Sequence, residues 1–428
     1  MPRRDLGLEF WKMTQKYGDL VYLNAFGKSM LVVGSYQIGW DLLEKRSANY
    51  SDRPGSVMAE LTTFDRMFLV CGYGERWRLH RRVFHESFNI DAVSQFRPAQ
   101  LNSARRFLFA ILESRHDIAE RLKFSVASNL IQVAYGIDMT EDNDDKYFDM
   151  VERISQTGEA IAFPILKYLP SWLPGGGFKT MAREAAEHME MCVSTLYNIA
   201  VDGIVSMTSD AAPPGSDTMN QRCDTVFFLA MAMYPDAQRK AQEELDRVVG
   251  PDRLPDFSDM QSLPYLGALL KELLRWHVIT PISLPHGAVA DDTYNGYFIP
   301  AGTAVAVNGL ARDPELYPDP DAFLPERYLD ASGQPDPSKP DPSDWAFGFG
   351  RRICPGQHFA EASMFIYAAS ILYAFGISPP VDADGSPVEL VHDTATIGVI
   401  AQPPFHDYVV RPRSAHAEQL VSGARRDA

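Results

Sequence analysis

The sequence predicts a mainly α-helical chain with a small β-rich region. Helical patterns of apolar residues dominate from Glu75 to Trp276, and a second apolar segment of helical length runs from Gln357 to Phe375. Strand and turn signals are confined to short stretches elsewhere. The 428 residues contain no internal repeat and no low-complexity linker, so we expect a single domain over residues 1–428.

Two strand regions are predicted from turn signals. Val21–Leu23 and Met30–Val33 flank Gly27-Lys28, which indicates an early hairpin. Asn295-Gly296 is typical of a two-residue hairpin turn, and the strand region around it continues through Thr303–Val307.

The C-terminal third begins with a proline-rich passage, residues 314–342, which excludes long regular structure. The segment Gln357 to Phe375 follows and is apolar nearly all round, as expected for a central buried helix. A last strand pair is predicted between Thr394–Ile400 and Asp407–Val410, and we expect the tail, residues 415–428, to be disordered.

Composition excludes several classes of protein. The net charge of −16 makes nucleic acid an improbable partner, because phosphate binding needs a basic surface. The four cysteines match no disulfide framework, which suits a reducing compartment; they are Cys71, Cys192, Cys223 and Cys354. The N-terminus contains no signal-peptide pattern, and the longest apolar stretch, around residues 364–377, is too short to span a bilayer.

The stretch AFGFGRRICPGQHFA, residues 346–360, surrounds Cys354 with glycines and arginines. A buried structural thiol is one interpretation, and a zinc half-site with His358 four residues later is another, although no second Cys/His pair is available. A third is a metal-bound thiolate, favoured by Arg352 and by the amino end of the helix that follows. Gly350 and Gly356 allow the backbone to approach a flat group, so thiolate ligation of heme iron fits the stretch best.

The pattern F-x-x-G-x-R-x-C-x-G resembles the heme-binding signature of the cytochrome P450 family. It is formed by Phe347, Gly350, Arg352, Cys354 and Gly356. The resemblance covers about residues 8–414 and implies the cytochrome P450 fold with heme b (iron protoporphyrin IX) as cofactor. It further implies that Cys354 is the axial ligand of the iron and that Arg352 contacts a heme propionate.

Glu272 and Arg275 lie one helical turn apart among leucines, whereas Glu244 and Arg247 have the same spacing in a polar run. A charged pair within an apolar helix must form an ion pair, because an unpaired buried charge is costly. The surrounding leucines, and not the spacing, therefore distinguish Glu272 and Arg275 from the second pair. In the family this E-x-x-R pair and a later arginine, here Arg327, form a locked structural cluster without chemistry of its own.

A basic cluster in GERWRLHRRVF stands out in this acidic chain. Trp77 and Arg81 share one helical face and match the family's W-x-x-x-R motif, which implies contacts to the heme propionates. Arg78 and Arg82 share another face, which we expect to point outward and to help dock an acidic reductase. His286 follows the E-x-x-R helix where similar proteins place another propionate contact; a core or surface histidine is the alternative.

The family's central helix carries A/G-G-x-D/E-T-T, whose acid–alcohol pair delivers protons to oxygen, and this chain lacks an intact copy. The best candidates are Asp217 and Thr218, directly after Pro213-Pro214, with Asp224-Thr225 as a second choice. Capping of a helix start by Asp217 is the alternative. By comparison with the family's fungal membrane members, we expect the chain to start after their N-terminal anchor and to lack the first part of this helix.

The resemblance implies a heme-thiolate monooxygenase that inserts one atom of O2 into a lipophilic small molecule, with NADPH used through a separate NADPH–cytochrome P450 reductase. Residues 163–178 would form a lid, and residues 62–68 and 396–399 would line the pocket. The style of the sequence is similar to fungal members that oxidise terpenoids or polyketides in secondary metabolism. The resemblance to these fungal members is compatible with a location on the cytoplasmic side, peripheral to the endoplasmic reticulum. The alternatives are a heme-binding protein without oxygen activation and a heme-thiolate isomerase or dehydratase.

Overall fold

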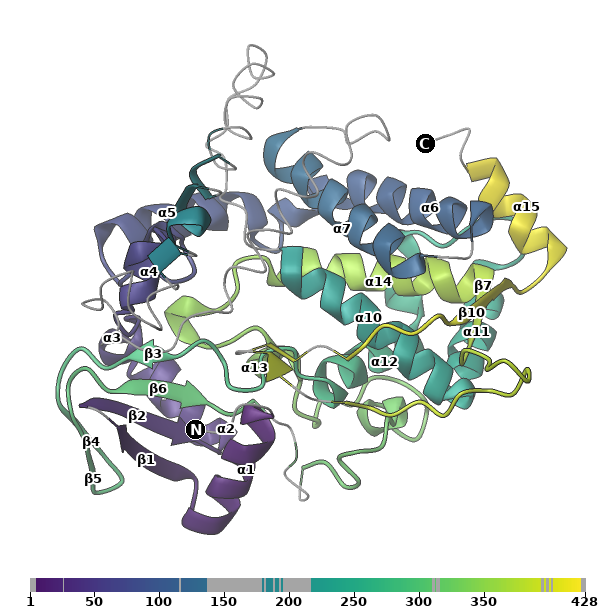
Figure 1. The fold of residues 1–428 in the computed structure, drawn as a ribbon. Coiled ribbons are helices and arrows are strands. Elements are labelled where there is room, and N and C mark those ends of the chain that lie inside the picture. Colours follow the sequence, from purple (N-terminus) through teal and green to yellow (C-terminus); the bar gives the residue numbers. More distant parts are fainter. Residues whose placement is uncertain are drawn as a thin grey trace.

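The computed structural model describes residues 5–424 with several gaps. Short gaps lie at 26, 115–116, 310–311, 313–315, 394–395, 398–399 and 402. Within 137–216, only residues 179–180, 182–187, 189–191 and 194 are described. The described part is mainly α-helical with small sheets, as the sequence predicts (Figure 1).

The strand-rich part contains a four-stranded sheet in the order β1-β2-β6-β3. The strands of this sheet are β1 (Leu20–Ala25), β2 (Lys28–Val33), β3 (His286–Gly287) and β6 (Ala304–Val307). β1 and β2 form the early hairpin, and β6 runs parallel to β2 with Val32 opposite Ala306. The predicted turn at Asn295-Gly296 joins β4 (Asp292–Tyr294) to β5 (Tyr297–Ile299), and both turn residues have positive φ, as this hairpin type requires.

The helical part forms the main core. Its long helices are α6 (Arg97–Glu113), α7 (Ile118–Tyr135), α10 (Asp217–Met233), α11 (Pro235–Val249), α12 (Pro264–Trp276) and α14 (Gln357–Ala374). Every residue of α14 from Ala362 to Ala374 is buried, which confirms the predicted central helix. α14 lies between the α6–α7 pair and α10 (Figure 1).

Further helices are α1 (Leu6–Tyr17), α2 (Tyr36–Trp40), a π-helix (Asp41–Lys45), α3 (Ser47–Tyr50), α4 (Val57–Leu61), α5 (Glu75–Phe88) and α13 (Ser343–Ala346). Short 3₁₀ helices lie at Phe64–Arg66, Ala92–Phe96, Phe257–Ser262, Pro325–Tyr328 and Gly350–Arg352. No helix in the described residues is long and apolar enough to cross a membrane.

Two predictions about the C-terminal part are wrong. β10 (Val409–Pro412) pairs with β7 (Phe375–Ser378), while β8 (Thr396–Ile397) and β9 (Ile400–Ala401) pair with each other. The predicted disordered tail instead begins with α15 (Ala415–Ala424), which packs on α6 with Ala417 and Val421 buried. A short helix with only two buried apolar positions gives a weak signal in sequence, because packing rather than propensity stabilises it.

Glu244 and Arg247, which have the same spacing as Glu272 and Arg275 in a polar run, do not form the exposed ion pair that the sequence suggested. Arg247 is exposed, but Glu244 is buried and accepts the backbone N–H groups of Tyr265 and Leu266, each at 2.9 Å. Glu244 therefore caps the amino end of α12, which is the helix that contains Glu272.

Candidate cofactor site around Cys354

Cys354 lies in a tight loop between the 3₁₀ turn at Gly350–Arg352 and α14. Its N–H donates to the carbonyl of Phe347 at 2.8 Å, and its carbonyl accepts the N–H of Gln357 at 3.4 Å. The thiol is free, and its burial raises its pKa. The N–H of Gly356 and the guanidinium of Arg81 act in the opposite direction. The cation that favours the thiolate is thus Arg81 from α5, and not Arg352 as the sequence suggested.

Arg81 joins α5 to the cysteine loop. Its Nη1 donates to the carbonyl of Ile353, the residue before Cys354, at 2.6 Å. Trp77 lies one turn earlier on the same face, as predicted, and is 3% exposed. Arg78 and Arg82 are exposed on the other side of the helix, which confirms that they face outward.

Arg352 points from the cysteine loop toward α5. Its Nε donates to the carbonyl of Ser51 and its Nη2 to that of Cys71, each at 2.8 Å, and its guanidinium lies 4.6 Å from the Trp77 ring centroid. The Nε1–H of Trp77 is buried and has no hydrogen-bond partner among the described residues. An orphaned buried donor of this kind indicates an acceptor that the chain itself does not supply.

The structure adds Arg53, which the sequence analysis missed. Its guanidinium donates to the carbonyls of Leu69, Leu284 and Pro285 at 2.7–3.0 Å. Burial and then the nearby Arg352 lower its pKa to about 9. No motif or spacing in the sequence identifies Arg53 as a site residue, because it is a single arginine before a proline. Only its burial near the guanidinium of Arg352 indicates a role.

His286 is buried in β3, and its Nδ1–H donates to the carbonyl of Tyr50 at 2.6 Å. Burial, Arg53 and Arg352 lower its pKa to about 3. The structure therefore places His286 near the same arginines, in a neutral state.

Arg53, Arg81 and Arg352 form no ion pair with a carboxylate in the described part of the chain. Buried cations are normally paired, so three unpaired guanidinium groups beside an orphaned indole N–H fit an anionic group from outside the chain. The two carboxylates of heme match this donor set, and Cys354 supplies the thiolate that its iron requires. The residues present therefore fit heme.

The two glycines of the signature, Gly350 and Gly356, occupy their positions for different physical reasons. Gly350 has φ +59°, and a Cβ there would overlap the backbone carbonyl of Leu43 in the π-helix, so close protein packing requires glycine. A Cβ at Gly356 would meet only the sulfur of Cys354, at 4.0 Å. Only Gly356 remains compatible with the predicted close approach of a flat group. Phe347 is buried in the main core.

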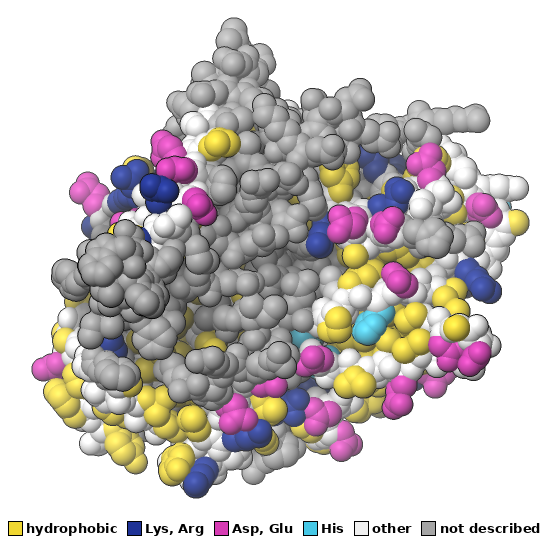
Figure 2. Space-filling view, in the orientation of Figure 1, with side chains coloured by type: hydrophobic (Ala, Val, Ile, Leu, Met, Phe, Trp, Pro, Cys, Tyr) yellow, Lys and Arg dark blue, Asp and Glu magenta, His cyan; other side chains and the backbone are white. Residues whose placement is uncertain are grey.

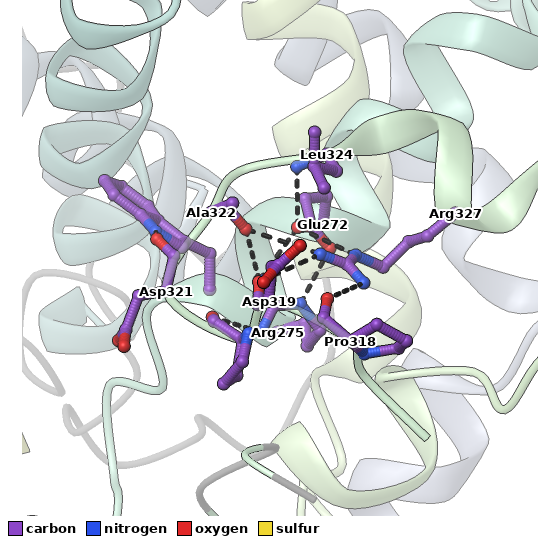
Figure 3. Close-up of polar contacts among 10 residues, drawn as sticks. Glu272, Arg275, Pro318, Asp319, Asp321, Ala322, Leu324 and Arg327 are labelled. Carbon is purple, nitrogen blue, oxygen red and sulfur yellow. Dashed lines mark hydrogen bonds and ion pairs between the residues drawn. The ribbon is translucent and has the colours of Figure 1, made fainter. Parts of the chain in front are cut away.

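Glu272, Arg275 and Arg327 form the predicted cluster (Figure 3). Glu272 is fully buried and accepts Nε and Nη2 of Arg275 at 2.8 Å, and Nε of Arg327 at 3.1 Å. The remaining guanidinium donors bind carbonyls of the loop before Arg327, at residues 318–322. The cluster therefore attaches α12 to this irregular loop, which confirms its structural role.

Other predicted site residues are only partly described. α10 begins at Asp217, so Asp217 and Thr218 lie in its first turn, and their side chains lie outside the described part. Thr225 is buried farther along α10. The proposed lid, residues 163–178, also lies outside the described residues.

The zinc interpretation of Cys354 and His358 receives no support from the described residues, in which no group of three metal-ligating side chains converges. His358 instead faces Glu361, with Nδ1 at 3.5 Å from the carboxylate.

Buried histidines predict an acid-sensitive fold. The pKa values of His277, His286 and His392 are lowered to about 4, 3 and 3, mainly by burial. In the unfolded chain these groups titrate near pH ~6.5, so the unfolded state binds more protons below that pH. The free energy of unfolding should fall as pH falls from about 6.5 to about 4, by about 2–3 kcal/mol for His277 alone.

Urea unfolding at about pH 7 and at about pH 5 measures this dependence. A His277→Asn variant should show a flatter dependence on pH than the wild type. Equal pH profiles for the two proteins would contradict the prediction.

Comparisons with known proteins agree with this geometry. The family model described as "Cytochrome P450" matches residues 2–210 and 214–401. "Cytochrome P450 monooxygenase COX2" of Coprinopsis cinerea is 36% identical, over 98% of this chain and 88% of that protein. "Tryptamine 4-monooxygenase" of Psilocybe cyanescens is 36% identical, over 99% and 91%. A zebra fish cytochrome P450 solved with progesterone shares the fold, with a TM-score of 0.75 at 23% identity, over 95% of this chain and 99% of that one.

The alignment with COX2 spans 465 positions, and this chain has 428 residues, so at least 37 aligned positions (465 less 428) have no residue here. The match nevertheless extends over nearly the whole chain and includes the cysteine loop, α5 and the Glu272 cluster. The chain therefore belongs to the cytochrome P450 family, whose members are heme-thiolate oxidoreductases that incorporate oxygen from O2.

Proposed function

We propose that this protein is a monooxygenase that holds heme b through Cys354 and inserts one oxygen atom from O2 into a lipophilic small molecule. The observation that supports it most is the orphaned N–H of buried Trp77. The ring centroid of Trp77 lies 4.6 Å from the guanidinium of Arg352, and Arg81, one turn later on the same helix, binds the loop that contains Cys354. Thiolate-ligated heme, when bound, favours O–O cleavage.

The chain's own residues then have distinct roles. Trp77 Nε1, Arg81, Arg352 and Arg53 would hold the propionates, with His286 as a neutral neighbour. Arg81 also fixes the cysteine loop through the Ile353 carbonyl. Desolvation raises the pKa of the Cys354 thiol, and the thiol form would resist oxidation until iron is bound.

The test is the spectrum of the reduced carbon monoxide complex of the purified protein. The wild type should show the red-shifted band of a heme thiolate, and Cys354→Ala should lose that shift completely. Cys71→Ala is the matched control, because Cys71 is the other free cysteine among the described residues. A spectrum that survives Cys354→Ala would reject the assignment.

We propose NADPH–cytochrome P450 reductase as the electron donor, docking on the exposed basic face of α5. Arg76, Arg78 and Arg82 are exposed there, in a chain of net charge −16. Reversing the charge of Arg78 and Arg82 together should slow reduction of the heme by the reductase about tenfold and reduce its dependence on salt. Stopped-flow reduction measures this, with dithionite reduction as the control. Unchanged reduction by the reductase would exclude this surface.

Asp217 and Thr218 remain our candidates for proton delivery. A heme protein without oxygen activation is the second candidate function, since the alignment with COX2 includes positions that this chain lacks. Substrate-dependent consumption of NADPH with the reductase separates the two functions.

Fungal secondary metabolism is the setting that we propose, as for fungal relatives of this chain. The style of the sequence leads us to propose a terpenoid or polyketide as substrate. Peripheral contact with the endoplasmic reticulum fits the strand-rich part, where Figure 2 shows hydrophobic side chains gathered on the surface. The exposed aromatic residues of its strands include Tyr22, Tyr297 and Phe298.

A further inference from the structure

The cysteine loop packs into two different hydrophobic clusters. Phe347 is buried in the main core, whereas Phe349, two residues later, is buried in the cluster of the strand-rich part. That second cluster also contains Leu43 of the π-helix. Cys354 itself packs against the main core again. The position of Cys354 therefore depends on how the strand-rich cluster is held beside the main core.

The segment from Leu43 to Ser51 contacts this loop at two points. The carbonyl of Leu43 packs directly against Gly350, where it would overlap a Cβ. The carbonyl of Ser51 accepts the Nε–H of Arg352 at 2.8 Å. Because both contacts are made by backbone carbonyls of the segment, a rotamer change in the segment cannot compensate for its displacement. A shift of residues 43–51 would therefore displace the loop as well.

Asp292 binds this segment between its two contacts with the loop. Both carboxylate oxygens of Asp292 accept Nη1 of Arg46, at 2.9 and 2.8 Å, and one of them accepts the hydroxyl of Tyr50 at 2.9 Å. Nη1 of Arg46 also donates to the carbonyl of Thr293 at 3.0 Å. Asp292 is the first residue of β4, so these bonds attach the segment to the β4–β5 hairpin.

The surroundings make Asp292 an ionised anchor. Desolvation opposes its ionisation, but hydrogen bonds from Arg46 and then Tyr50 lower its pKa below the usual value. The bonds to Asp292 are thus charge-assisted, which makes them stronger than neutral ones. Tyr50 is fully buried. A second attachment lies nearby, because the hydroxyl of Tyr294 donates to Asp41, the first residue of the π-helix, at 2.8 Å.

We propose that Asp292 is a positioning residue for Cys354. Its hydrogen bonds with Arg46 and Tyr50 fix residues 43–51, and these residues fix the loop that contains the thiol. This inference rests on the proposed function, because the thiol needs a defined position in order to bind iron. Asp292 acts through the backbone of the segment and not on the sulfur itself.

The test compares Asp292→Ala with Asp246→Ala, a matched control in the helical part. Asp246 on α11 accepts Nη1 and Nη2 of Arg413 at 2.8 and 2.6 Å. Each variant loses an arginine–carboxylate pair with two hydrogen bonds. Hydrogen exchange of residues 347–356 should accelerate about tenfold in Asp292→Ala only, the factor that one charge-assisted hydrogen bond contributes to a local opening equilibrium.

Two milder variants keep the test decisive if Asp292→Ala does not fold. Asp292→Asn retains an acceptor without the charge, and Tyr50→Phe removes one of the bonds, so each should accelerate the same exchange about threefold. In the heme-loaded protein, the reduced carbon monoxide complex of Asp292→Asn should contain about threefold more of the form without the thiolate band. Asp246→Ala should match the wild type in both measurements.

Unchanged exchange of residues 347–356 in all three variants of the anchor would overturn the proposal. Equal acceleration in Asp246→Ala would also overturn it, because the effect would then be a general loss of stability.

Failure of the proposed function would be recognised separately. A wild-type protein without the heme-thiolate spectrum would contradict that function, while the exchange of residues 347–356 would still show whether Asp292 holds the loop.

Discussion

Replacement of Glu272 by alanine is expected to lower the free energy of unfolding by about 3–5 kcal/mol, the cost of removing one partner from a buried ion pair. Glu272 is fully buried and pairs with both Arg275 and Arg327. It also accepts the N–H of Leu324 at 2.8 Å. The variant would leave two buried guanidinium groups without the carboxylate of Glu272, and the backbone N–H of Leu324 without its acceptor.

Urea unfolding followed by tryptophan fluorescence measures the loss. Glu243→Ala is the matched control, since Glu243 pairs with Arg239 at 2.6 Å on the exposed side of α11. An exposed pair of this kind contributes about 0.5 kcal/mol or less. Similar losses for the two variants would show that the Glu272 cluster is not the structural lock inferred here.

Gly350→Ala is expected to prevent folding of the cysteine loop, with a loss of stability of about 3 kcal/mol or more. A methyl group at this position would overlap the carbonyl of Leu43, and both contacting groups are backbone. Neither side can relax by changing a rotamer. The positive φ of 59° adds the strain of a left-handed conformation.

Gly333→Ala separates these two causes. Gly333 has φ +77° with nothing near its would-be Cβ, so only the conformational cost of about 1 kcal/mol applies. Thermal unfolding and heme content should be nearly normal for Gly333→Ala and severely reduced for Gly350→Ala. Equal effects would mean that the contact with the π-helix has no energetic importance.

Features with strong local signals were predictable from the sequence. The β1–β2 hairpin, the Asn295-Gly296 turn and the central helix α14 each depend on residues that are close in the chain, and each is confirmed. The cysteine signature and the Glu272–Arg275 pair were found in the same way, because their spacing is fixed within one loop or one helical turn.

Features that depend on distant partners were missed. The sequence offered Thr394–Ile400 as the neighbour of β10, but β7 competes successfully because it continues directly from the buried helix α14. Glu244 looked like half of a solvated pair and instead caps α12. In both cases the hydrogen-bond partner is a backbone group of an element that is distant in sequence. The residues adjacent to β10 or to Glu244 therefore do not predict it.

The electrostatic interactions at the site likewise divide into those that short motifs predict and those that depend on tertiary packing. By itself the sequence determined which residue is the thiol, which helix contains Trp77 and Arg81, and which family the chain resembles, since all three are properties of short motifs. Only the tertiary structure decided that Arg81 rather than Arg352 acts on Cys354, that Arg53 joins the buried cations, and that Asp292 binds Arg46. The physical reason is that burial and Coulomb interactions depend on distances through space, which the chain acquires only when its segments pack together.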